Sequence, residues 1–521
     1  MSSTQTSLTA SPVHPLLYEI NTRCWLWQLR ERHGTEITLA NIPEEEVARW
    51  RELGFTHIWL MGVWRNGPQS RACSLRLEAL RDDFARLLPD LSDEDFIGSP
   101  YAIAGYETCQ EFGGNEGLNK FRQRLNGAGL KLILDFIPNH MGIDHPWITQ
   151  RPELFVQGLP TAPGTFRVQT SSGARWIAHG KDPNFAPWGD TGQLDYRNGA
   201  TRDAMIEQLT SLGRRCDGVR CDMAMLILND VFTRTWEKFP TLPQTAEGKT
   251  ASGKRHHLAR VPPASEFWAD AIIAVKKEQP DFLFLAEAYW GLERRLLELG
   301  FDFAYDKTLT DHLVARSPAQ LQKHLFGLPR NTLQAGAHFL ENHDEPRIAS
   351  LLSPQEVRAA ALLVAGLPGM RLLHQGQLTG LTLRTSVHLR RGPPEAPDSE
   401  ITEFYNLLLR QLQKSAVGRG WWEILKPMPA WPGNPSAENL ILLQWEARAG
   451  EFDLVAVNLA AHSSQCYVRL TITGVENKEW QMSNILGRER FVRAGAQSRE
   501  PGLYLDLPAH AAQLFHFIGV D

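Results

Sequence analysis

The sequence predicts an α/β fold, a (β/α)8 TIM barrel with a subdomain inserted after the third strand and a C-terminal all-β domain. Eight short apolar runs alternate with stretches of helical period, which is the rhythm of a parallel sheet. A segment rich in Pro, Gly and Trp interrupts this rhythm after the third run and is too long for an ordinary loop. Beyond residue 418, short alternating strands replace the helical stretches.

These changes of pattern define three expected units. Residues 1–140 and 194–418 should form the barrel, and residues 141–193 should form the inserted subdomain over its mouth. Residues 419–521 should form a C-terminal β-sandwich. The predicted barrel strands are residues 17–26, 55–63, 130–137, 217–222, 282–287, 301–305, 337–341 and 370–373.

Helices between these strands are predicted from apolar residues that share one face and from capping residues. Ser353 and Glu356 have the spacing of a capping box ahead of an apolar helix. Residues 239–265, which contain Pro, Gly, Ser and several cations, predict a mobile loop before the fifth strand. The other predicted helix faces are Val47, Trp50 and Leu53; Leu118, Phe121 and Leu125; and Met205, Leu209 and Leu212.

The composition excludes several classes of protein. Of 521 residues, 43% are hydrophobic and 22% are charged, as in folded globular proteins. The net charge of −5 has the wrong sign for a nucleic-acid-binding protein. Neither a signal peptide nor a membrane span is predicted, so we expect a cytoplasmic protein without a membrane partner. The six cysteines form no CxxC pair, which predicts reduced thiols rather than a zinc site, and the oligomeric state stays open.

The polar residues that end the predicted strands indicate where the chemistry occurs, because reactive side chains of such barrels lie at the C-terminal ends of the strands. The fourth strand ends in Arg220 and Asp222, which alternation places on one face. The fifth strand ends in Glu287, and Asp344 follows the seventh. Three acids and a cation at one mouth suit the cleavage of glycosidic bonds, which needs a nucleophile, a proton donor and a stabiliser of positive charge.

Four segments then resemble the ordered motifs of the α-amylase superfamily, family thirteen of the glycoside hydrolases. They are DFIPNH at residues 135–140, GVRCD at 218–222, LFLAEAYW at 283–290 and ENHDEPR at 341–347. GQLDYRN at 192–198 resembles an additional motif of this family, and LLHQGQLTG at 372–380 resembles its eighth strand. The resemblance extends from about residue 18 to the C-terminus.

This resemblance implies roles for individual residues. Asp222 would be the nucleophile, Glu287 the acid and base, and Asp344 the residue that holds the hydroxyls of the sugar being cleaved. The carbohydrate substrate would also contact five further residues. These are Tyr101, which would stack on the sugar, Arg220, which would orient Asp222, and His140, His343 and Arg347.

The sequence departs from the family pattern at the acceptor side and at a common metal position. Gly105 stands where an acidic residue is common, and Met225 and Leu226 stand where amylases often have Lys and His. Asn139 matches a position that ligates calcium in many relatives, but the sequence offers no partner ligands, so we predict no cofactor and no metal.

The resulting hypothesis is a retaining α-glycosidase that cleaves α-glucosidic bonds in small malto-oligosaccharides, disaccharides or related α-glucosides. The same residues would serve a transglycosylase, glucanotransferase or isomerase of the trehalose-synthase or maltosyltransferase kind, because water and a sugar hydroxyl compete for the same intermediate. A non-catalytic carbohydrate-binding scaffold is a further alternative. A barrel enzyme for phosphorylated metabolites is disfavoured, since Gln375, Gly376 and Gln377 make a poor phosphate loop.

Overall fold

The computed structural model describes residues 14–76, 78–240 and 265–520 of the chain. Eight parallel strands close into a barrel, in the order β1-β14-β13-β12-β11-β10-β5-β2. The prediction of a (β/α)8 barrel is therefore confirmed, although most of the loop predicted at 239–265 lies outside the described residues. The barrel strands are β1 (Leu16–Asn21), β2 (His57–Met61), β5 (Lys131–Phe136), β10 (Gly218–Cys221), β11 (Leu283–Ala286), β12 (Phe303–Tyr305), β13 (Gly336–His338) and β14 (Met370–His374).

The first predicted strand, residues 17–26, is too long. β1 ends at Asn21, whose side chain accepts a hydrogen bond from the backbone N–H of Cys24 and caps helix α1 (Thr22–His33). A capping Asn satisfies one of the free N–H groups at a helix start, so the chain turns into a helix at this point. Trp25 and Leu26 are still buried, but on the inner face of that helix.

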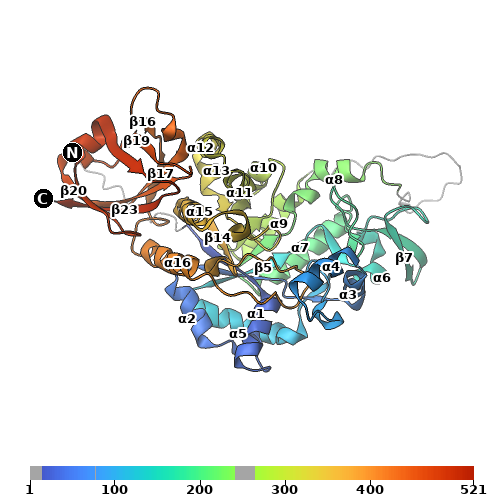
Figure 1. The fold of residues 1–521 in the computed structure, drawn as a ribbon. Coiled ribbons are helices and arrows are strands. Elements are labelled where there is room, and N and C mark those ends of the chain that lie inside the picture. The colour runs from blue at the N-terminus through green and yellow to red at the C-terminus, as the bar shows by residue number, and fades with distance from the viewer. Residues whose placement is uncertain (1–13, 77, 241–264, 521) are drawn as a thin grey trace.

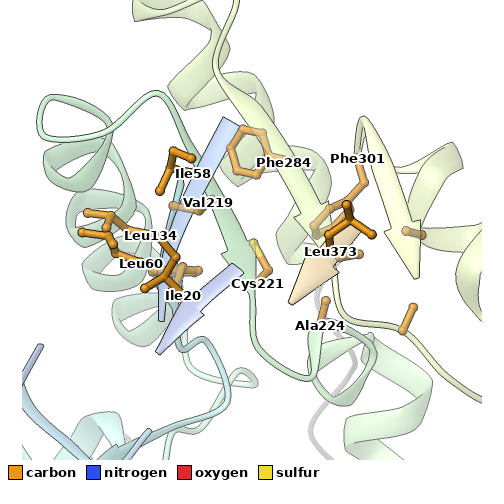
Figure 2. Packing of buried hydrophobic residues seen from close by; sticks show 14 of the residues in the cluster. Ile20, Ile58, Leu60, Leu134, Val219, Cys221, Ala224, Phe284, Phe301 and Leu373 are labelled. Carbon is orange, nitrogen blue, oxygen red and sulfur yellow. The ribbon is translucent and has the colours of Figure 1, made fainter. Parts of the chain in front are cut away.

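Alternation along the strands separates two apolar layers. Figure 2 shows the outer layer, in which Ile58, Leu60, Val219 and Phe284 pack between the strands and the surrounding helices. The opposite face of each strand points into the barrel, where a smaller cluster fills the interior. This inner cluster includes Leu17, Trp59, Ile133, Leu285, Tyr305, Phe339 and Leu372.

The helices predicted from a shared apolar face are present around the barrel. In α2 (Glu44–Glu52), the buried residues Val47 and Trp50 share the inner face. Helix α15 (Pro354–Gly366) has the expected capping box, because the Ser353 hydroxyl accepts from the backbone of Glu356. None of the helices in the described part of the chain is long and apolar enough to cross a lipid bilayer. The other helices predicted from an apolar face are α5 (Gly114–Gly127) and α7 (Gly199–Gly213).

Two excursions leave the barrel from the C-terminal ends of its strands. Between β2 and β5 the chain forms β3 (Trp64–Asn66), α3 (Pro68–Leu75), α4 (Glu78–Leu87) and β4 (Ile103–Thr108). The second excursion is the insertion after the third barrel strand, and in it β6 (His140–Gly142) pairs with β9 (Thr191–Gln193). Beyond this pair, β7 (Thr165–Thr170) and β8 (Gly173–Ala178) form a hairpin far from the C-terminal domain (Figure 1).

The C-terminal part of the chain is all β, as predicted, and its two sheets enclose a separate apolar cluster. The larger sheet has the order β15-β17-β18-β23-β20-β21 and the smaller sheet the order β16-β19-β22. In chain order these strands are β15 (Trp421–Leu425), β16 (Met428–Pro429), β17 (Leu440–Arg448), β18 (Glu451–Asn458), β19 (Ser464–Val468), β20 (Glu479–Asn484), β21 (Arg490–Ala494), β22 (Leu503–Leu507) and β23 (Ala512–Val520).

Trp445 joins the C-terminal domain to the barrel. It is fully buried, its indole N–H donates to the carbonyl of Gly366 at 2.9 Å, and its ring lies 5.3 Å from that of His14. We expect Trp445→Ala to lower the free energy of unfolding by about 3 to 5 kcal/mol, because a large cavity opens at this junction. Thermal and urea denaturation measure this loss. Trp431→Ala is the matched control, since Trp431 is 52% exposed and its loss should change stability by less than about 0.5 kcal/mol.

Candidate active site

Arg220 and Asp222 lie together at the end of β10. Val219 and Cys221 face the outer layer, so alternation turns Arg220 into the barrel, where it is completely buried. One guanidinium nitrogen of Arg220, Nη1, donates to Oδ1 of Asp222 at 2.8 Å. The same nitrogen lies 3.9 Å from Oδ1 of Asp135 on the neighbouring strand β5. A fixed positive charge therefore accompanies the Asp222 carboxylate.

Glu287 follows β11 and contacts the second terminal nitrogen of the same guanidinium. Its Oε2 lies 2.7 Å from Nη2 of Arg220 and accepts from the backbone N–H of Met223 at 2.6 Å. Its Oε1 accepts from the hydroxyl of Tyr289 at 3.0 Å. Burial raises the pKa of Glu287 to about 7, with help from the negative charges of Asp222 and Asp344 and against the opposing charge of Arg220. Glu287 can therefore hold a proton near neutral pH.

Aromatic rings surround the Arg220 guanidinium inside the barrel. Its central carbon lies 5.3 Å from the ring centroids of both Trp59 and Tyr101 and 6.0 Å from that of Tyr305. Ring faces attract a cation, and their bulk keeps water away from it. The rings therefore fix the guanidinium between its two carboxyl partners.

Asp344 stands at the rim, after β13, with its side chain 48% exposed. The backbone N–H groups of Asp344 and Glu345 donate to Oδ1 of Asn342, which shapes the turn. Oδ2 of Asp344 lies 3.0 Å from Nε2 of His343. Partial burial raises the pKa of Asp344, but the charge of His343 outweighs this effect and holds that pKa below its ordinary value. Asp344 is thus an ionised acid at the mouth.

His343 and Tyr101, both predicted sugar contacts, also contact each other. The Tyr101 hydroxyl lies 2.6 Å from Nε2 of His343, and the two rings stack with centroids 5.4 Å apart. Nδ1 of His343 lies 2.5 Å from Oε1 of Glu19. Both nitrogens of His343 therefore have protein partners, and Tyr101 holds its ring beside Arg220 and His343.

His140 begins β6, at the point where the insertion leaves the barrel. Its ring lies 5.1 Å from that of Trp188, which comes from the far end of the insertion. Burial lowers the pKa of His140, so its neutral form is favoured. A neutral imidazole at this rim can donate one hydrogen bond and accept another.

Arg347 lies behind the rim rather than on it. Its Nη1 donates to Oε1 of Glu341 at 2.7 Å and to the carbonyl of Gln375 at 2.6 Å. It also lies 2.9 Å from Nδ1 of His374. These contacts join the segment after β13 to the end of β14. A sugar contact for Arg347 stays a prediction, and the structure gives its guanidinium a bracing role.

Asn139 does not fit the calcium position that its place in the motif suggests. Its side-chain oxygen accepts from Nε2 of Gln193 at 3.0 Å, and its carbonyl accepts from the same nitrogen. Within the described parts of the chain, no group of three His, Cys, Asp or Glu side chains is placed to hold a metal ion.

Sequence reasoning missed two polar residues of the site. Glu19 is completely buried. The one sequence feature that could have indicated it is an acid within the otherwise mostly apolar strand β1. Tyr289 stands two residues after Glu287, within the motif at residues 283–290, and the motif predicts no role for it. Both contact residues that the strand ends did predict.

Comparison with known proteins gives a consistent family. The model for the alpha-amylase catalytic domain matches residues 46–396. Maltase 1 of Drosophila virilis is 26% identical over 54% of this chain and 50% of its own length. Trehalose-6-phosphate hydrolase of Escherichia coli (strain K12) is 23% identical over 55% of this chain and 56% of its own length. The chain thus matches about half the length of these curated relatives.

Solved structures share the fold. The maltogenic alpha-amylase AmyB from Thermotoga neapolitana superposes with a TM-score of 0.66, at 18% identity, over 97% of this chain and 98% of its own. An alpha-amylase from Geobacillus thermoleovorans gives a TM-score of 0.63 at 18% identity, over 96% of this chain and 98% of its own. At this identity the superpositions establish the architecture.

The raised pKa of Glu287 predicts that this residue destabilises the folded protein at alkaline pH. An unfolded Glu with a pKa of 4.5 loses its proton well before the folded one, whose pKa is about 7, so stability falls between these values. The difference corresponds to about 3 kcal/mol. We expect Glu287→Gln to raise the melting temperature at pH 8 and to leave it nearly unchanged at pH 4.5, as measured by calorimetry.

Glu356→Gln is the matched control with the opposite sign. Contacts with Arg316 and Ser353 overcome burial and lower the pKa of Glu356 to about 2. Its ionised form therefore stabilises the folded protein above pH 4.5, and this stabilisation is lost as the pH falls toward 2. Glu356→Gln should lower the melting temperature at pH 8. A Glu287→Gln variant that is less stable than wild type at pH 8 would contradict the assignment.

Proposed function

The chain belongs to the α-amylase family, and we propose that it is a retaining α-glucosidase acting on short α-glucosides. The family model covers most of the barrel, and the curated relatives are glycoside hydrolases, so the protein is an enzyme of this superfamily rather than a carbohydrate-binding scaffold. One observation carries the more specific proposal. A single buried guanidinium, that of Arg220, contacts both Asp222 and Glu287.

Two carboxyl groups that share one guanidinium would lie beside the same bond of a bound substrate. Asp222 would attack the anomeric carbon while Glu287 gives its proton to the departing oxygen, so that a glycosyl-Asp222 ester forms as the glycosidic bond breaks. The Glu287 carboxylate then takes a proton from water, which attacks the same carbon and releases Asp222. Two inversions give net retention.

The two acids have environments suited to these different tasks. Arg220 donates directly to Asp222, which places a positive charge beside the nucleophile, whereas burial raises the pKa of Glu287 so that it keeps a proton. Asp344, ionised at the rim beside His343, would accept hydrogen bonds from the hydroxyls of the sugar. Tyr101 and His140 would line the same sugar, in agreement with their places at the mouth.

The names of the relatives support a small substrate. They include maltases, an oligo-1,6-glucosidase and a trehalose-6-phosphate hydrolase. We propose malto-oligosaccharides, disaccharides or related α-glucosides as the substrate class. Transfer to a sugar acceptor is the alternative outcome, because a sugar hydroxyl can replace water in the second step. A cytoplasmic location stays a prediction.

The pKa of Glu287 sets an expected pH profile. Since the acid must be protonated to assist the leaving group, kcat/KM for an unactivated α-glucoside should fall above pH of about 7, by about tenfold per pH unit. Steady-state kinetics with maltose between pH 4 and 9 measures this alkaline fall in kcat/KM. A value of kcat/KM that stays constant up to pH 9 would contradict the role of Glu287 as proton donor.

The proposed roles are separated by two substitutions and an activated substrate. Asp222→Asn should abolish turnover of every α-glucoside, because no nucleophile remains. Glu287→Gln should lose maltose hydrolysis but still accept α-glucosyl fluoride, whose fluoride leaves without protonation. The intermediate should then accumulate as a glucosyl unit on the peptide that carries Asp222, visible by mass spectrometry.

Added azide tests the second step, because it needs no general base. It should release the trapped sugar as the α-glycosyl azide, whereas a β-azide would contradict retention. A label on another residue, or normal maltose hydrolysis by Glu287→Gln, would overturn the assignment of the two acids. Product analysis with wild type, with and without acceptor sugars, distinguishes hydrolysis from transfer.

A further inference from the structure

Glu19 is a buried acid that the proposed steps do not use. Alternation along β1 sends Leu17 and Glu19 into the barrel and Ile20 to the outer layer. The Glu19 side chain is completely buried, and its Oε1 lies 2.5 Å from Nδ1 of His343. Its other oxygen, Oε2, has no hydrogen-bond partner among the residues that the structure describes.

Such an arrangement stabilises the fold poorly. A buried carboxylate with a single hydrogen-bond partner is not compensated for the water that it loses, and an apolar residue at this position would serve the barrel better. Apolar side chains such as Leu17, Trp59 and Phe339 do fill the remainder of the interior. The contact between Glu19 and His343 is therefore better explained by its effect on Asp344 at the rim than by its effect on stability.

His343 connects Glu19 to the mouth of the barrel. Nδ1 faces Glu19, while Nε2 lies 3.0 Å from Oδ2 of Asp344 and 2.6 Å from the Tyr101 hydroxyl. An imidazole can turn about its bond to the backbone, and a partner at Nδ1 fixes both the turn and the site of protonation. With Glu19 at Nδ1, a charged imidazole also carries a proton at Nε2, the nitrogen that faces the Tyr101 hydroxyl and Oδ2 of Asp344.

We propose that Glu19 is a positioning residue for Asp344, which it holds ionised and aimed at the sugar through a charged His343. This rests on the proposed function, in which Asp344 binds the sugar hydroxyls. Glu19 itself touches neither the substrate nor the reacting atoms.

Several charged or titratable groups face His343 and bear on its protonation. Asp344 follows it directly, Asp135 and Arg220 lie on β5 and β10, and Tyr101 and Tyr305 adjoin Arg220. Burial lowers the pKa of His343, but Asp344 and Glu19 outweigh this and raise it well above its ordinary value. Removing the charge of Glu19 leaves Asp344 as the one carboxylate in contact with His343 among the described residues, so the imidazolium should lose its proton at a lower pH.

The test uses Glu19→Gln and α-glucosyl fluoride. This substrate needs no proton from Glu287, so the alkaline limb of kcat/KM no longer reports that acid. We expect kcat/KM at pH 7 to fall by about 10- to 100-fold, the effect of losing a charged hydrogen bond. The pH above which kcat/KM falls should also be lower than in the wild type, by about one pH unit or more. Glu19→Asp, which keeps the charge, should restore the limb toward its wild-type position.

Asp306→Asn is the matched control. Asp306 is also a buried acid held between two histidines, His324 and His338, but it lies outside the site. Its substitution should lower the melting temperature and leave the pH profile with α-glucosyl fluoride unchanged. If Glu19→Gln also lowers the melting temperature and leaves the pH dependence of kcat/KM unchanged, Glu19 has only a structural role and the proposal is overturned.

A measurement on the wild type covers the case in which Glu19→Gln does not fold. Nitrogen-15 NMR of labelled histidines, with the His343 signals identified from their loss in His343→Asn, should show both ring nitrogens protonated at pH 7. A neutral His343 would overturn the proposal. Failure of wild type to use α-glucosyl fluoride would instead overturn the proposed function, and the role of Glu19 with it.

Discussion

The whole site depends on one buried cation. Arg220 loses all contact with water, and such a charge is tolerated only where carboxylates and rings replace its hydration. Asp222 and Glu287 supply the carboxylates, from β10 and the end of β11. Because β10 lies between β5 and β11, closure of the barrel brings these partners to the guanidinium. The closed barrel thereby brings both acids to the same guanidinium.

The balance of charge around Arg220 explains why one acid keeps its proton. Five carboxyl groups, those of Glu19, Asp135, Asp222, Glu287 and Asp344, are grouped with two cations, Arg220 and His343. Like charges in a buried region cannot all ionise. Part of this excess of negative charge is relieved at two of the buried acids, since burial raises the pKa of Asp135 to about 6 and that of Glu287 to about 7.

Sequence reasoning located the barrel and the strand-end acids because both follow from simple periodicity. Arg220 and Asp222 are two residues apart at the end of an apolar run, and such spacing fixes their common face. It failed where one specific side-chain contact decides the outcome. The Asn21 cap ends β1 early, and Glu19 has a role that depends on His343, a residue 324 positions away. The bracing of Arg347 by Glu341 and His374 is equally invisible until β13 and β14 are adjacent.

The loop after β10 shows why the resemblance to the family supports the positions of the acids better than it supports a preference for a particular leaving group. Met223 adopts a left-handed backbone conformation, with φ of 42°, and presents its N–H to Glu287. The next turn then buries Met225 and Leu226, which stand where amylases often have Lys and His. Buried apolar side chains cannot donate a hydrogen bond to a sugar, so in the proposed reaction this loop would position Glu287 without contacting the acceptor through Met225 and Leu226. Under the proposed function, this loop would constrain the chemistry at Glu287, whereas the preference for a substrate would depend on other segments of the rim.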